Sequence, residues 1–262
     1  MKRLVDIMEK VLFEPGVVSK ITINRPERHN AIDGETAMLI TKYVKKASSD
    51  SRCRCIVITG AGGKAFCAGA DVSHIAKLKT RKEAGGFFDL LYRMRKEITE
   101  SPKAVIAVIS GYCLGGGNEL AIACDLRIAS IDSVFGQPEA RLGIIPGGGA
   151  TYSLHSIIGM SRAKEMVFTG KSISAGKALR IGLVNSLCDK RDLTKNALEL
   201  CESVVLCGPN AIALAKSAMN KATKADYRYE RRAFVESVVG KEGRRGIQAF
   251  LERNRTKPAK KK

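Results

Sequence analysis

The stretch Gly111–Gly149 reads GYCLGGGNELAIACDLRIASIDSVFGQPEARLGIIPGGG. Its triple glycine, residues 115–117, runs into a helix-like segment that carries Glu119, and a second carboxylate, Glu139, follows in FGQPE. Glycines let a backbone approach a ligand closely, and a helix start adds unpaired N–H donors with a dipole that favours negative charge. Two carboxylates beside such donors can move protons around a carbonyl whose oxygen becomes negative.

On both sides of this stretch, strand patterns alternate with helix patterns. Strands are predicted over residues 18–24, 55–59, 104–110, 126–129, 133–136 and 183–187, and helices over residues 34–49, 83–100, 117–123, 152–158, 161–169 and 174–181. After residue 189 only helical patterns follow, over residues 192–207, 210–221, 227–239 and 242–254. This order predicts an α/β core followed by a helical C-terminal region.

The length of 262 residues fits one large domain with an added region. We predict an α/β core over residues 1–190, a helical C-terminal region over 191–255, and a basic flexible tail, TKPAKKK, over 256–262. The longest uncharged stretch, residues 104–118, is too short and too rich in glycine for a membrane helix, so no membrane span is expected.

The eight cysteines are scattered, and no CxxC pair suggests a zinc ribbon or a thioredoxin-type site. We expect reduced, mostly buried thiols and a cytoplasmic protein. Three isolated histidines, His29, His74 and His155, show no metal-ligand spacing, so no metal is expected. The net charge of +19 predicts attraction to polyanions, either phosphorylated ligands, acidic membrane surfaces or nucleic acid.

Five segments in order resemble the enoyl-CoA hydratase/isomerase family, also called the crotonase family. They are ITINRPERHNAI, IVITGAGGKAFCAGAD, GYCLGGGNELAIACDLRIAS, FGQPEARLGIIPGGG and GKSISAGKALRIGLVN. The resemblance implies a spiral of β-β-α turns and a helical C-terminal trimerisation region, with a homotrimer or a homohexamer as the assembly. It also implies an acyl-CoA thioester as the substrate and no separate cofactor, because coenzyme A is part of the substrate.

The family's motif positions imply that the N–H groups of Ala70 and Gly116 hold the thioester oxygen. Its hydratases use two glutamates, which fall on Glu119 and Glu139 here. We assign Glu119 as the base that activates water and Glu139 as the acid that protonates Cα. Hydration of enoyl-CoA, or the reverse dehydration of a short 3-hydroxyacyl-CoA, is the predicted reaction.

RPERHNA resembles the loop that holds the adenosine end of coenzyme A through backbone groups. Its expected ligand contacts are Arg28, Asn30 and Ala31, with Ala68 and Asp71 in the second loop, although Asp71 could equally cap the helix that follows. The backbone of Gly147 is expected to help hold the site. The acyl pocket is expected to be shaped by Ile75, Leu78, Phe87 and Leu91, with at least half of these four expected to be core residues instead.

Tyr152 and Ser153 stand where family hydratases commonly have a Gln-Arg pair. This departure places a local packing or subunit contact in question, but not the acid-base pair. Two alternatives stay open. One is double-bond isomerisation on the same scaffold, and the other is RNA binding through the basic surface, without a stacking-aromatic motif to support it.

Overall fold

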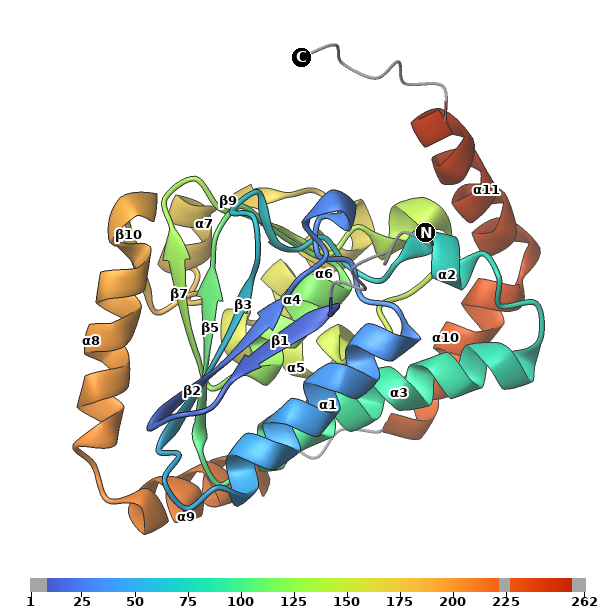
Figure 1. The fold of residues 1–262 in the computed structure, drawn as a ribbon. Helices are drawn as coiled ribbons and strands as arrows, with labels where there is room; N and C mark the ends of the chain where they lie inside the picture. Colours follow the sequence, from blue (N-terminus) through green and yellow to red (C-terminus); the bar gives the residue numbers. More distant parts are fainter. Residues whose placement is uncertain (1–8, 222–226, 256–262) are drawn as a thin grey trace, which may run out of the picture.

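The computed structural model describes residues 9–221 and 227–255, and a six-stranded sheet forms its centre. The strand order is β1-β2-β3-β5-β7-β10, and every neighbouring pair is parallel except β1 with β2. Figure 1 shows this sheet nearly edge-on. Its strands are β1 (Val11–Glu14), β2 (Val18–Ile23), β3 (Cys55–Gly60), β5 (Ala104–Ile109), β7 (Leu126–Ser130) and β10 (Ser186–Cys188).

A second sheet of very short strands continues the ends of the first, in the order β4-β6-β8-β9. Strands β4, β6 and β8 are parallel neighbours, and β9 pairs antiparallel with β8. The strands are β4 (Ala65–Cys67), β6 (Tyr112–Leu114), β8 (Val134–Gly136) and β9 (Ile173–Ser174).

Each turn of the chain passes from a long strand to a short strand and then to a helix. The sequence β3-β4-α2-α3 is followed by β5-β6-α4 and then by β7-β8 and the helices after it. This order confirms the predicted β-β-α spiral. The helices of these turns are α1 (Gly34–Ser49), α2 (Val72–Ile75), α3 (Arg81–Glu100), α4 (Gly116–Ala123), α5 (Ala150–Ile158), α6 (Met160–Thr169) and α7 (Ala175–Arg180), with 3-10 turns η1 (Pro26–Arg28) and η2 (Glu139–Leu142).

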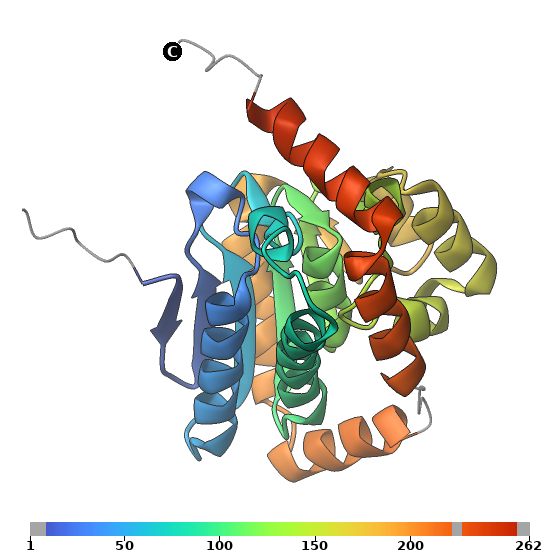
Figure 2. The ribbon, with the colours of Figure 1, turned by 90° about the vertical axis from the view of Figure 1, so that its right-hand side faces the viewer.

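The large sheet is buried on both faces, which explains the continuous apolar runs of β3 and β5. Successive side chains of a strand point to opposite faces. Cys55 and Val57 of β3 therefore pack toward α8 (Leu193–Val205), whereas Ile56 and Ile58 face the side covered by α1 and α3. Figures 1 and 2 show α8 and the α1–α3 pair on opposite sides of the sheet.

Beyond β10 the described residues are helical, beginning with the turn η3 (Lys190–Asp192) and α8. Lys216 anchors α9 (Pro209–Lys221), because its buried Nζ donates to the carbonyls of Ile98 and Lys103 and pairs with Asp125 at 2.7 Å. Helix α10 (Tyr227–Val239) returns across α3, and α11 (Lys241–Arg255) projects from the body (Figures 1 and 2).

The predicted basic tail, residues 256–262, lies outside the described residues. Within the described part, no single helix has the length and apolar composition to cross a membrane, while one bent pair, Lys190–Val205 with Pro209–Asn220 at 99°, meets those two criteria together.

Candidate active site

Three neighbouring strands, β4, β6 and β8, end at the same edge of the second sheet because they run parallel. The loops that follow them, near residues 68–70, 115–119 and 138–139, therefore converge and enclose a cavity of about 70 Å³. Seven of the eleven predicted site residues line this cavity: Ala68, Ala70, Ile75, Gly116, Glu119, Glu139 and Gly147.

The backbone amides of Ala70 and Gly116 lie side by side at the cavity wall. A Cβ added to Gly116 would stand 3.1 Å from the Ala70 nitrogen, which shows how closely the two loops approach. Among the described residues no acceptor takes a hydrogen bond from either N–H group. Two adjacent, unpaired donors, one of them at the start of α4, are suited to a developing oxyanion.

Two of the three consecutive glycines are required by geometry. Gly115 has φ of +52°, in the left-handed region that side chains disfavour. Gly117 presses against β4, and any Cβ there would overlap the carbonyl oxygen of Cys67. The triple glycine thus allows α4 to begin directly against the loop that carries Ala70.

Glu119 lies in the first turn of α4 and is only 4% exposed. Its Oε1 accepts a hydrogen bond from the N–H of Ala150 at 3.0 Å, and the N–H groups of Gly147 and Gly148 also donate to this carboxylate. Burial raises the pKa of Glu119 above its ordinary value, while these three donors and the charge of Arg95 oppose the rise. The backbone of the second glycine cluster therefore holds the carboxylate of Glu119 in place.

Arg95 supplies positive charge to this region from α3, far away in sequence. Its guanidinium lies over the ring of Tyr152, with Cζ 4.7 Å from the ring centroid, and its Nε is buried. Tyr152, one of the two departures from the family pattern, thus packs against an arginine from another helix.

Glu139 is held by a chain of buried amides. Its Oε1 accepts from Nε2 of Gln137 at 3.0 Å, and Oε1 of Gln137 accepts from Nδ2 of Asn118 at 2.8 Å. Both amide side chains are fully buried. This relay joins α4, next to Glu119, to the turn that carries Glu139, so the two carboxylates are positioned by one network.

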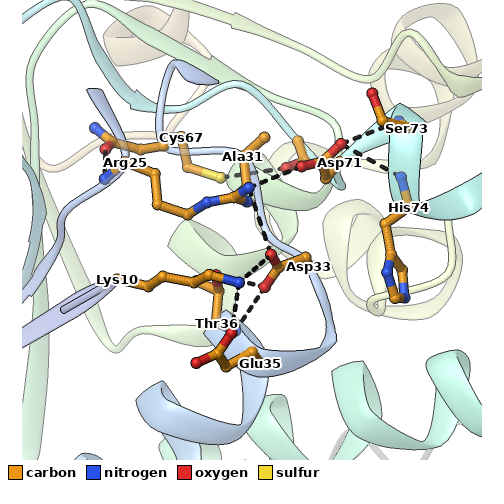
Figure 3. A network of polar contacts seen from close by, with 12 residues as sticks. Lys10, Arg25, Ala31, Asp33, Glu35, Thr36, Cys67, Asp71, Ser73 and His74 are labelled. Carbon is orange, nitrogen blue, oxygen red and sulfur yellow. Dashed lines mark hydrogen bonds and ion pairs between the residues drawn. The ribbon is translucent and has the colours of Figure 1, made fainter. Parts of the chain in front are cut away.

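The buried guanidinium of Arg25 joins two loops beside the cavity, the one that carries Ala31 and Asp33 and the one that carries Asp71 (Figure 3). It donates to the carbonyl of Ala31, pairs with Asp71 at 2.9 Å and reaches Asp33 at 3.4 Å. Lys10, the residue before β1, forms an ion pair with Asp33, with its Nζ 2.8 Å from Oδ2. Burial alone would raise the pKa of Asp33, but hydrogen bonds from Lys10 and Thr36 and the charge of Arg25 lower it to about 2.

Four predicted ligand residues, Arg28, Asn30, Ala31 and Asp71, do not line the cavity. The Asn30 side chain is fully buried and holds the backbone, donating to Ala61 and Ala65 and accepting from the N–H of Arg25. Asp71 caps α2 through the N–H groups of Ser73 and His74, as its alternative assignment expected (Figure 3). Arg28 is exposed on the same loop.

The four residues of the predicted acyl pocket divide between the cavity and its surroundings. Ile75 and Leu91 line the cavity, but Leu78 and Phe87 do not. Phe87 packs instead on the ring of His74, with ring centroids 4.8 Å apart. Leu78 lines a neighbouring groove.

Within residues 9–221 and 227–255, no group of three or more metal-binding side chains is present. The thiol of Cys67, which contacts the carbonyl oxygen of Gly69, is fully buried, and burial raises its pKa to about 12. It is therefore protonated at neutral pH and not an activated nucleophile.

The sequence profile of the enoyl-CoA hydratase/isomerase family matches residues 14–260. The chain belongs to this family. It is 38% identical over 251 residues to the short-chain-enoyl-CoA hydratase of Clostridium acetobutylicum, covering 94% of this chain and 95% of that protein. It is 36% identical to the crotonyl-CoA hydratase of Syntrophomonas wolfei, covering 94% and 95% of the two chains.

The fold also matches solved structures of the enoyl-CoA hydratase/isomerase family. A crystal structure of an enoyl-CoA hydratase from Bacillus anthracis superposes with a TM-score of 0.79 at 33% identity, covering 94% of this chain and 97% of the other. The family resemblance identified from five sequence segments is thus confirmed along almost the whole chain. Sequence reasoning did not identify Arg25, Arg95, Gln137 or Asn118 as parts of the site.

Proposed function

We propose that this protein is an enoyl-CoA hydratase, which adds water reversibly to a trans-2-enoyl-CoA thioester to give the 3-hydroxyacyl-CoA. The observation that carries the proposal is the single cavity lined by two backbone amide sites, Ala70 and Gly116, and two carboxylates, Glu119 and Glu139. The hydratase names of two relatives support the same reaction.

In the proposed reaction, the N–H groups of Ala70 and Gly116 donate to the thioester carbonyl oxygen. Electron density moves to this oxygen when a nucleophile adds to Cβ, so both hydrogen bonds strengthen as the enolate forms. Removing one such donor typically costs about 3 kcal/mol of transition-state stabilisation.

The ionised carboxylate of Glu119 takes a proton from water while the water oxygen bonds to Cβ. The protonated carboxyl of Glu139 then delivers its proton to Cα as the enolate returns to the thioester. One glutamate gains a proton and the other loses one, so the site is restored after proton exchange with solvent. The raised pKa of Glu119 makes it a stronger base than an exposed glutamate.

The coenzyme A part of the substrate is proposed to lie along the loops that carry Arg28, Asn30, Ala31 and Asp71, outside the cavity. No separate cofactor is required by this chemistry. A cytoplasmic location and a homotrimeric or homohexameric assembly remain part of the proposal. Large apolar side chains that are exposed on the single chain, such as Phe168 at 73% and Leu206 at 88%, support the assembly.

Glu119→Gln and Glu139→Gln test the proposal with crotonyl-CoA, followed by loss of the ultraviolet absorbance of the conjugated thioester. Each variant is expected to lose about 10²–10⁴ in kcat, while binding of a saturated acyl-CoA stays within a few-fold. Glu199→Gln, an exposed glutamate on α8, is the matched control. Near-normal hydration by the double variant would overturn the proposed mechanism.

Isomerisation is separated from hydration by running the reaction in ¹⁸O-labelled water, because only hydration places the label in the product.

Binding of RNA is a second candidate function. It is supported by a groove of about 800 Å³ between η2 and α11, whose lining includes Arg141, Lys241, Arg245 and Arg253 and, within the described residues, no acid. Salt-sensitive binding of single-stranded RNA would be the expected observation.

A further inference from the structure

The catalytic cavity is closed on its apolar side by residues from three separate parts of the chain. Ile75 comes from α2, Leu91 from α3, and Phe234 from the C-terminal helix α10. A volume of about 70 Å³ holds roughly five to seven water-sized groups at 10–15 Å³ each. The carbon and oxygen of the thioester carbonyl with three to five further carbons fill this space.

Phe234 is fixed in position on several sides. It is 3% exposed, its ring centroid lies 5.6 Å from that of Phe88, and a Cβ added to Gly147 would overlap the ring. One turn earlier on α10, Arg231 forms a two-point ion pair with Asp89 of α3. The ring therefore cannot withdraw without breaking contacts that hold α10 to α3.

One turn later, α10 is tied to the loop after η2, where the hydroxyl of Ser237 accepts a hydrogen bond from the N–H of Ile145 at 3.2 Å. Ile145 itself lines the cavity. This bond ties the cavity wall to the helix behind it.

A second space lies directly behind this wall. A groove of about 450 Å³ runs between α2, α10 and α11, and its apolar lining includes Leu78, Val238 and Ile247. Ile75 lines both the cavity and the groove. On α10, Phe234 faces the cavity and Val238, one turn on, faces the groove.

We infer that Ile75 and Phe234 form a partition that limits the acyl chain to about four to six carbons, and that the groove behind it would accept longer chains if the partition were shortened. This inference rests on the proposed hydratase function and names its substrate class. Chain length is set at this partition, because Ile75 borders both the small cavity and a larger groove, which is apolar at Leu78, Val238 and Ile247 and charged at Lys79, Arg244 and Glu252.

The test compares 2-enoyl-CoA esters of four, six, eight and ten carbons on the wild type, Ile75→Ala and Phe234→Ala. The wild type is expected to lose at least tenfold in kcat/KM between six and ten carbons. Ile75→Ala is expected to raise the ratio of ten-carbon to four-carbon kcat/KM by at least tenfold. Phe234→Leu is included because the alanine variant removes a large buried ring.

Leu78→Ala is the matched control, since Leu78 is buried and lines the groove but not the cavity. Its length preference is expected to equal that of the wild type. Competitive binding of butyryl-CoA and decanoyl-CoA, measured by calorimetry, provides a readout that needs no turnover.

Wild-type kcat/KM that is equal for four and ten carbons would overturn the inference, as would folded Ile75→Ala and Phe234→Leu proteins with an unchanged preference. If the wild type hydrates none of the esters, the proposed function is wrong. The binding measurements then test the partition without turnover. Tighter binding of butyryl-CoA than of decanoyl-CoA by the wild type, with a smaller difference in Ile75→Ala, supports the partition. Equal wild-type affinities for the two esters overturn it.

Discussion

Gln137 donates a hydrogen bond from its Nε2 to Oε1 of Glu139 at 3.0 Å, from a position two residues earlier in the same turn. This bond fixes the carboxyl group proposed to protonate Cα. Because Gln137 is itself held by Asn118 of α4, the orientation of one glutamate depends on the helix that carries the other.

Gln137→Met is expected to lower kcat about twofold to tenfold with little change in KM, because a hydrogen bond to a neutral carboxyl group is worth about 0.5–1.5 kcal/mol. The buried Nδ2 of Asn118 also loses its acceptor, so stability should fall by about 1–3 kcal/mol in urea unfolding. Gln248→Met, on the exposed side of α11, serves as the control. A variant with full kcat would show that this bond does not orient the acid.

Arg95→Met removes a positive charge that lowers the pKa of Glu119. The pKa of Glu119 should then rise further, and the carboxylate needed as a base should appear only at higher pH. The acidic limb of the plot of kcat/KM against pH is therefore expected to move to higher pH. The value of kcat/KM on the plateau should change less. Arg93→Met, two residues earlier and exposed, should leave the profile in place. An unmoved limb in the Arg95 variant would contradict the role of this charge.

Gly117→Ala forces a Cβ into the carbonyl of Cys67, so α4 and β4 must separate. We expect a loss of about 1–3 kcal/mol in stability, as for overpacked cores, together with weakened thioester binding at the displaced amides. Gly86→Ala on α3 is the matched control, because nothing lies within 4 Å of its added Cβ. The control should gain about 0.5–1 kcal/mol from helix propensity. Equal melting temperatures for both variants would count against the predicted clash.

Asp33→Asn tests the charge network beside the cavity. The folded pKa of Asp33, about 2, lies below its ordinary value of 3.8, so its ionised form stabilises the fold. This contribution, roughly 2 kcal/mol, is fully present above pH 3.8 and is lost as pH falls toward 2. The variant should therefore be less stable than the wild type at pH 7, with the difference shrinking below pH 4. A pH-independent difference in urea unfolding would refute the ionic origin.

The long elements could be predicted from the sequence because their patterns are local. The helix Gly34–Ser49 was predicted at the same bounds, and the buried runs of β3 and β5 ended within a residue of their predicted limits. Strand β1 and the three-residue strands β4 and β6 were missed. Three residues give too little periodicity, and these short strands exist because parallel neighbours supply their hydrogen bonds.

The glycines and glutamates of the site could be found because they follow one another in a motif. Arg95 and Phe234 could not, since α3 and α10 bring them to the cavity from far away in sequence. Gln137 stood beside Glu139 in QPE, yet only its complete burial shows that it orients a carboxyl group. Contacts between distant elements decide these roles, and no short window of sequence contains them.

Phe234 follows the strands of both sheets in the chain, and this order has a consequence during synthesis. A nascent chain that has emerged only as far as α9 contains both sheets, both acidic residues and the paired amides, yet its reaction chamber is open to water on one side. The complete cavity therefore forms only after α10 has been synthesised, and a product terminated shortly before Tyr227 would carry the catalytic groups in a cavity that lacks one wall.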